Sequence, residues 1–197
     1  LIVALALFVA CGGGSHLAQD AVADGPGMDA ARDGPPSCGS ANAVQVSTGA
    51  QYSCARLADG TLRCWGGNFQ AQLGDGLMQH QVCDDPSGNP FDCSPRPVEV
   101  AGISDATELS TELDTACALR GDGHVACWGL NDAGEVGVAP PTQEFTPITV
   151  PMIANATAVA VGTSFACALS SDGHVSCWGA NQAGQLGDGQ ADQDAHS

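Results

Sequence analysis

Short apolar runs separated by turn residues dominate residues 41–197. In the clearest stretch, Val159–Val161, Phe165–Leu169 and Val175–Trp178 have the length and composition of strands. The last two runs flank Ser171-Asp172-Gly173, and an Asp-Gly pair between apolar runs is a strong hairpin signal. The pattern therefore predicts an all-β fold made of hairpins.

One phrase occurs three times in this region. Each copy has a Cys, a second Cys ten residues later, then Trp-Gly and a short turn that ends in Gly. The copies read SCARLADGTLRCWGGNFQAQLGDG from Ser53, ACALRGDGHVACWGLNDAGEVG from Ala116 and ACALSSDGHVSCWGANQAGQLGDG from Ala166. A period of about 50 residues predicts stacked units rather than one globular core. We place the units at 41–105, 106–155 and 156–197.

The cysteine spacing predicts a disulfide across each hairpin. A three-residue loop centred on Asp172, with Gly173 in the left-handed conformation, puts Cys167 directly opposite Cys177. Opposed residues lie about 4.5–5.5 Å apart at Cα, within the disulfide range of about 4.4–6.8 Å. The three predicted pairs are Cys54–Cys64 about Asp59-Gly60, Cys117–Cys127 about Asp122-Gly123, and Cys167–Cys177 about Asp172-Gly173.

A tryptophan follows the second Cys of every copy, at Trp65, Trp128 and Trp178. Neighbouring residues of a strand point to opposite faces, so these indoles lie on the face away from the disulfide. We expect them to pack between units. A ligand-stacking platform is the alternative.

The first copy carries about 13 extra residues after Gly74-Asp75-Gly76, and these include Cys83 and Cys93. Their spacing of ten again predicts a disulfide, here within a loop. A stapled loop on a rigid scaffold is a candidate binding surface, because it loses less entropy on binding. The alternative is a neutral, stapled insertion.

Composition narrows the function classes. With a formal net charge of −17 and only five Lys and Arg residues, the chain lacks the cationic patches that nucleic acids require. Ten cysteines indicate an oxidising compartment. Structural zinc is disfavoured because no Cys-x-x-Cys occurs, and Asp20, Asp24, Asp29 and Asp33 lack the spacing of a calcium loop. We predict no cofactor and no metal.

The beginning of the chain indicates export. Residues 1–10 form an apolar run typical of the h-region of a signal peptide, although no initiating Met or basic segment precedes it. Phe8-Val9-Ala10-Cys11 resembles the lipobox of bacterial lipoproteins, which implies lipidation of Cys11 as a membrane anchor. An ordinary cleaved signal is the alternative. Residues 11–40 are interpreted as a flexible, acidic tether.

Cys38 is left over from these assignments. It would pair with a Cys beyond the C-terminal end of this sequence, or stay a free or intermolecular thiol.

The repeats resemble those of the regulator of chromosome condensation family. The resemblance rests on the Cys-Ala-Leu core, the Asp-Gly turn, Trp-Gly, and Asn-x-x-Gly-Gln-Leu-Gly at residues 181–187. The first copy departs from this pattern at Gln70-Ala71, and the second at Glu135-Val136. The resemblance implies a seven-bladed β-propeller of four-stranded blades. Three repeats are present, so we expect an N-terminal fragment of a longer protein.

Catalytic motifs are absent from the sequence. It has no G-x-S-x-G, H-E-x-x-H or Walker A motif, and the Asp-Gly pairs do not have the spacing of the sialidase Asp-box. Tyr52 is the single tyrosine, which speaks against sialidase chemistry. His124 and His174 hold equivalent places after the turn glycine, where the first copy has Thr61, so we interpret them as surface residues.

These observations predict a non-enzymatic, exported and lipid-anchored propeller of the cell envelope, or else a secreted one. It would act as a scaffold that binds an unknown protein or surface ligand. The alternatives are a protein inhibitor, or an accessory module of an extracellular enzyme. Nucleotide exchange on a nuclear GTPase follows only from the family name and does not fit an exported, acidic chain.

Overall fold

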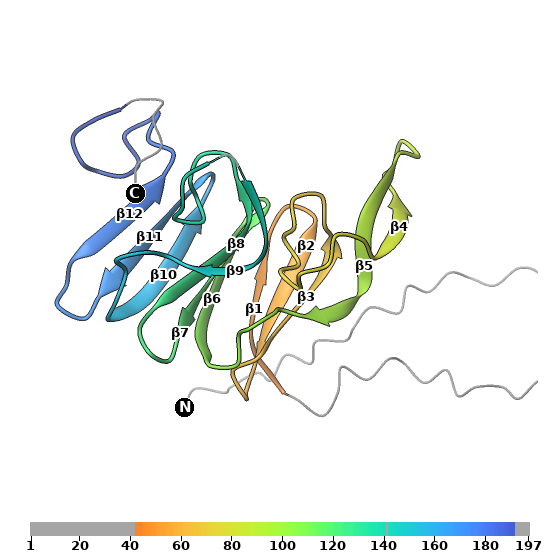
Figure 1. Cartoon of the computed structure of the whole chain (residues 1–197), viewed down its shortest axis with the longest axis horizontal. Helices are drawn as coiled ribbons and strands as arrows, with labels where there is room; N and C mark the ends of the chain where they lie inside the picture. Colours follow the sequence, from red (N-terminus) through yellow and green to blue (C-terminus); the bar gives the residue numbers. More distant parts are fainter. Residues whose placement is uncertain (1–41, 141, 192–197) are drawn as a thin grey trace, which may run out of the picture. The chain divides into compact units, whose positions relative to one another are not determined.

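The computed structural model describes residues 42–140 and 142–191, which form strands, turns and connecting loops without a helix. Three antiparallel sheets follow one another along the chain (Figure 1). The first has the order β1-β2-β3-β5-β4, with β1 (Ala43–Thr48), β2 (Tyr52–Leu57), β3 (Leu62–Gly67), β4 (Gln81–Asp84) and β5 (Pro90–Glu99). The second contains β6 (Ala106–Glu112), β7 (Thr115–Arg120), β8 (Val125–Asn131) and β9 (Thr142–Thr149). The third contains β10 (Ala156–Gly162), β11 (Phe165–Ser170) and β12 (Val175–Gly179).

The predicted all-β fold is confirmed. Within the described ranges no helix is long and apolar enough to cross a membrane. The predicted signal segment 1–10, the lipidated Cys11, the tether 11–40 and Cys38 lie outside the described residues.

The central hairpin of each sheet has a three-residue loop. In the first sheet, Leu57 N donates to Thr61 O at 2.9 Å and Gly60 N donates to Leu57 O at 3.0 Å. Gly60, Gly123 and Gly173 have φ angles of 83°, 81° and 88°, a left-handed conformation that glycine adopts without steric cost. The loop fixes the register that places each pair of cysteines opposite one another.

The three hairpin disulfides occupy non-hydrogen-bonded positions. Hydrogen-bonded and non-hydrogen-bonded pairs alternate along an antiparallel ladder, and Cys54–Cys64 lies three pairs beyond the hydrogen-bonded Leu57–Thr61. Non-hydrogen-bonded pairs are the closer ones. The Cα–Cα distances are accordingly 4.1, 4.1 and 4.0 Å, shorter than the spacing we expected from the sequence.

The second and third sheets each pack their tryptophan face on the disulfide face of the sheet before them. Trp128 is fully buried in a core with Cys54, Leu62 and Cys64, and its Nε1 donates to the backbone oxygen of Gln72 at 3.0 Å. The next interface repeats this arrangement, with Trp178 against Cys117 and Cys127 and a 2.9 Å bond to the backbone oxygen of Glu135.

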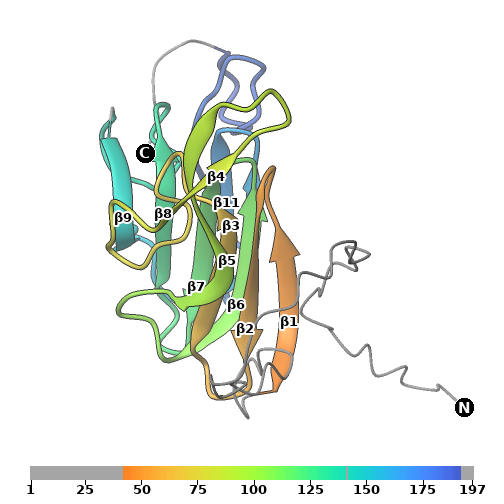
Figure 2. The ribbon, with the colours of Figure 1, turned by 90° about the vertical axis from the view of Figure 1, so that its right-hand side faces the viewer.

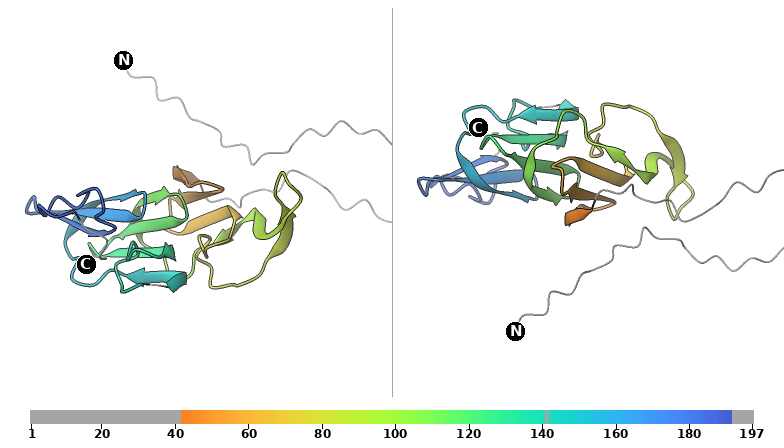
Figure 3. Two further views of the ribbon diagram at one scale, coloured as in Figure 1. Left: turned by 90° about the horizontal axis from the view of Figure 1, so that it is seen from above. Right: turned by 90° about the horizontal axis from the view of Figure 1, so that it is seen from below.

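Side chains also link the first strands of successive sheets. Gln45 on β1 donates to Leu109 O at 2.8 Å and accepts from Leu109 N at 3.1 Å. Between the second and third sheets, Glu108 accepts from Val159 N at 3.0 Å. β1 and β6 run along one side of the array and β9 runs along the other (Figures 2 and 3).

The turn after each tryptophan is held by a buried asparagine. The Oδ1 atoms of Asn68, Asn131 and Asn181 accept backbone bonds of 3.1, 3.1 and 3.2 Å from the residue five positions later. The carbonyls that receive Trp128 and Trp178 lie in these turns. The Asn-containing motif therefore positions the acceptors that join one sheet to the next.

Candidate functional site

The insertion of the first repeat forms a hairpin that extends the first sheet (Figure 1). The C-terminal half of β5 pairs with β3, and its N-terminal half, from Pro90 to Cys93, pairs with β4. The tip is Pro86-Ser87-Gly88, closed by a 2.9 Å bond from Asp85 N to Asn89 O. Gly88 has a φ of 82°, so this turn repeats the geometry of the three central hairpins.

The disulfide of the insertion has a different register. Cys83 lies opposite Phe91, and Cys93 lies opposite Gln81. The bridge therefore runs diagonally, with a Cα–Cα distance of 5.9 Å. The cause is the position of the tip, because this hairpin is centred on Ser87 whereas the two cysteines are centred on Gly88.

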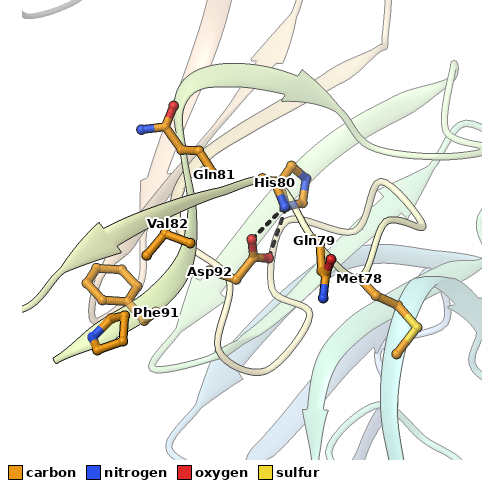
Figure 4. A pocket seen from close by; sticks show the side chains of 8 residues that line it. Met78, Gln79, His80, Gln81, Val82, Phe91 and Asp92 are labelled. Carbon is orange, nitrogen blue, oxygen red and sulfur yellow. Dashed lines mark hydrogen bonds and ion pairs between the residues drawn. The ribbon is translucent and has the colours of Figure 1, made fainter.

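His80 anchors the base of the hairpin between two carboxylates. Its Nε2 lies 2.7 Å from Asp75 Oδ2 in the turn after β3. Its Nδ1 lies 3.0 Å from Asp92 Oδ2 on β5, a contact drawn in Figure 4. Asn68 also donates to Asp92 Oδ2, at 2.8 Å. The His80 side chain is 8% exposed. The insertion is thus attached to its blade at both ends.

These contacts shift two ionisation equilibria. Burial alone lowers the pKa of His80, but hydrogen bonds and charge interactions with Asp75 and Asp92 outweigh burial, and the pKa of His80 is raised. Burial alone raises the pKa of Asp92, but hydrogen bonds from Asn68 and His80 outweigh it, and the pKa of Asp92 is lowered. Both pKa shifts favour a protonated His80 beside an ionised Asp92.

The arrangement fits anchoring better than catalysis. Both ring nitrogens of His80 contact carboxylates, so neither is directed at a substrate. A general acid or base needs a ring nitrogen within reach of the reacting group. Within 42–140 and 142–191, no group of His, Cys, Asp and Glu side chains could hold a metal ion.

Beside this anchor the hairpin exposes apolar side chains around a shallow groove of about 370 Å³ (Figure 4). Met78 and Val82 are each 73% exposed. Phe91 stacks on Phe69 with ring centroids 4.5 Å apart. The residues that line the groove are Met78, Gln79, His80, Gln81, Val82, Pro90, Phe91 and Asp92. Exposed apolar groups held on a stapled hairpin are a feature of interaction surfaces.

The aspartates and histidines that the sequence analysis assigned to the turns lie in or beside the hairpin turns. The carboxylates of Asp59, Asp122 and Asp172 accept backbone bonds from the residue two positions later, within the hairpin turns. A hydrogen bond from the Ser170 hydroxyl is the main cause that lowers the pKa of Asp172 to about 2. His174 is exposed and His124 is half-buried, and they lie 3.1 and 3.2 Å from the same turn carboxylates.

Trp65 differs from its two counterparts. It is half-buried, because the described residues contain no sheet before the first one. Val46 lies on the same face of the first sheet as Trp65 and is 53% exposed, whereas Leu109, at the equivalent position of the second sheet, is 2% exposed.

Sequence reasoning missed the anchor of the insertion. Asp75, His80 and Asp92 lie in one stretch of the chain but match no motif, and Asp92 comes from the far strand of the hairpin. Only the lone histidine inside a cysteine-stapled, acidic insertion could have drawn attention to the site.

Three antiparallel sheets that pack face to face in chain order define the blades of a β-propeller repeat protein. The repeats are regulator of chromosome condensation (RCC1) repeats. Family models of this repeat match residues 43–72, 122–169 and 156–185. No curated protein sequence matches the chain significantly.

Solved structures show the same fold. Human WBSCR16 superposes with a TM-score of 0.61 at 21% identity, over 80% of this chain and 38% of that one. Yeast RCC1 (Prp20), solved bound to Kap60, gives a TM-score of 0.62 at 20% identity, over 78% of this chain and 35% of that one. A separate Saccharomyces cerevisiae Prp20p structure gives 0.61 at 20% identity, over 78% of this chain and 36% of that one. The chain thus spans little more than a third of these relatives.

Proposed function

We propose that this protein is a non-catalytic scaffold that binds another protein through the hairpin inserted in its first blade. The observation that carries the proposal is the combination of a diagonal disulfide, a buried carboxylate–histidine anchor and exposed Met78 and Val82 on one short element. Rigid, exposed apolar groups bind with a small entropic cost. Prp20p, whose structure was described together with its binding to Gsp1p and histones, shows that a fold of this kind can bind proteins.

A hairpin replacement tests this function. Because Ser94 and Cys93 pair with β3, residues 81–92 are replaced by two glycines and Cys93 is changed to Ser, which leaves the blade strand in place. Chemical cross-linking on intact cells, followed by mass spectrometry, should identify a partner with the wild-type protein and lose it with the replacement. Equal cross-linking of both proteins would contradict the proposal.

We further infer that the scaffold is exported and anchored by a lipid on Cys11. The support is the apolar run of residues 1–10 before Cys11, and the four disulfides of the described blades, which favour an oxidising compartment. Growth with a labelled fatty acid should label the wild-type protein. Cys11→Ser should lose the label and release the protein from the membrane fraction. A Cys11→Ser protein that retains the label would overturn the anchor.

A further inference from the structure

The outer edge of β4 presents backbone groups that no described strand pairs with. β4 is the last strand of the first sheet. Asp85 and Asn89 form a hydrogen-bonded pair at the end of this hairpin, and bonded and non-bonded pairs alternate from there. Val82 and Asp84 therefore fall in non-bonded positions. Their N–H and C=O groups point away from β5, toward the side on which a further strand can pair.

The side chains of the same two residues give this edge its chemistry. Val82 and Asp84 are two positions apart and so share one face of the strand. Val82 is 73% exposed, and Asp84 is exposed and makes no ion pair with another described residue. An incoming strand thus meets an apolar contact and, two residues further on, an unneutralised carboxylate.

The edge is held ready for pairing. The Cys83–Cys93 disulfide fixes the middle of the hairpin, and His80 fixes its base between Asp75 and Asp92. A strand that is ordered before binding loses little conformational entropy when a partner pairs with it. Because β4 has only four residues, it offers a short and specific register rather than a long aggregation-prone edge.

Charge decides between two kinds of occupant. A second copy of this chain also carries a net charge of −17, so two copies repel each other. We propose that β4 binds an extended, basic segment of a partner protein as an added antiparallel strand, with an apolar residue against Val82 and a Lys or Arg against Asp84. The inference rests on the binding function proposed above and specifies its partner and geometry.

The test uses the full chain and a fluorescent peptide, Gly-Thr-Lys-Thr-Val-Thr-Lys-Thr, whose Lys precedes its Val by two residues as antiparallel pairing requires. Fluorescence anisotropy at low salt should show saturable binding. Hydrogen exchange of the Val82 and Asp84 amides should slow when the peptide is added. A peptide with Glu in place of both Lys residues should bind at least tenfold more weakly, because it repels Asp84.

Val82→Pro is the decisive variant. Proline removes the outward N–H of residue 82 and no hydrogen bond of the β4–β5 ladder, keeps an apolar side chain, and is tolerated on an edge strand. Val82→Pro should weaken peptide binding at least tenfold, whereas Val82→Thr, which keeps the N–H, should weaken it less. Mapping of the Cys83–Cys93 disulfide checks that the hairpin still forms.

Three results would overturn the inference. They are no saturable binding by the wild-type chain, equal binding by Val82→Pro, and self-association in sedimentation that Val82→Pro abolishes. The scaffold function is judged separately. If the hairpin replacement loses its cross-linked partner but Val82→Pro keeps the peptide, the scaffold proposal stands and the edge-strand mode fails.

Discussion

Trp178 Nε1 donates a 2.9 Å hydrogen bond to the backbone oxygen of Glu135 in the blade before it. Trp128 makes the same bond to Gln72, so one contact is repeated at both described interfaces between blades. The acceptor lies in a turn held by a buried asparagine, and the donor lies beside a cysteine of the disulfide. Each interface between blades is therefore formed by the same three features, which are the asparagine-held turn, the tryptophan and the hairpin disulfide.

Removing this bond should weaken the stack. Trp128→Phe keeps much of the apolar contact but leaves the buried Gln72 carbonyl without its donor, which should cost about 1–3 kcal/mol. Trp65→Phe is the matched control, because Trp65 is half-buried and no described blade precedes it. We expect a loss below about 0.5 kcal/mol for that control. Urea unfolding followed by far-UV circular dichroism measures both, and equal losses would contradict the role of the bond.

Glu135 places a carboxylate in the interface to which its backbone oxygen contributes. It is fully buried, its Oε1 has no hydrogen-bond partner, and burial raises the pKa of its carboxyl group. Gln72 and Gln185 occupy the same place in the other two turns. Glu135→Gln should therefore stabilise the protein at pH 7 by about 1–2 kcal/mol, because an amide avoids the cost of a buried charge.

The sign of the pH effect gives a second check on Glu135. A raised folded-state pKa means that stability falls as pH rises from the unfolded pKa through the folded one. Glu135→Gln should remove this fall, whereas Glu99→Gln, at an exposed pair with Arg63, should leave it unchanged. An unchanged pH profile in Glu135→Gln would show that the carboxylate is solvated.

Sequence reasoning reached the fold because the turn, the cysteine spacing and the tryptophan repeat together. The distance from Cys167 to Cys177 and the position of Gly173 leave one register for the hairpin. The same reasoning could not give the register of Cys83 and Cys93, because the turn at Ser87 follows from Asp85 and Asn89 rather than from the cysteines. It also could not find the His80 anchor, whose partners meet only after β5 pairs with β4.

The attachment of the hairpin should depend on pH. The raised pKa of His80 stabilises the folded anchor below the unfolded histidine value near pH 6.5, and this contribution is lost as pH rises through the folded value. The lowered pKa of Asp92 gives stability above the unfolded value near pH 4, which is lost as pH falls through the folded value. The anchor should therefore be strongest between about pH 4 and 6.5.

Hydrogen exchange of the Gln81 and Cys83 amides, which face β5, measures this dependence at several pH values after correction for intrinsic rates. His80→Gln should remove the loss of protection that develops as pH rises above the unfolded histidine value near pH 6.5. His124→Gln is the control, because that side chain is 45% exposed and lies in a turn remote in sequence from the insertion. A pH dependence that survives in His80→Gln would assign it to another group.

The buried disulfide of the second blade should stabilise the protein in two ways. Cys117–Cys127 closes a loop of about ten residues, which in the chain-entropy picture is worth about 2–3 kcal/mol, and both cysteines are fully buried against the third blade. Cys167–Cys177 closes an equal loop but is only half-buried. Replacing both cysteines of a pair by Ser should thus cost more in the second blade than in the third, because hydroxyl groups are buried there. Denaturant unfolding of the two double variants measures the difference, and equal costs would show that loop closure alone accounts for the stabilisation.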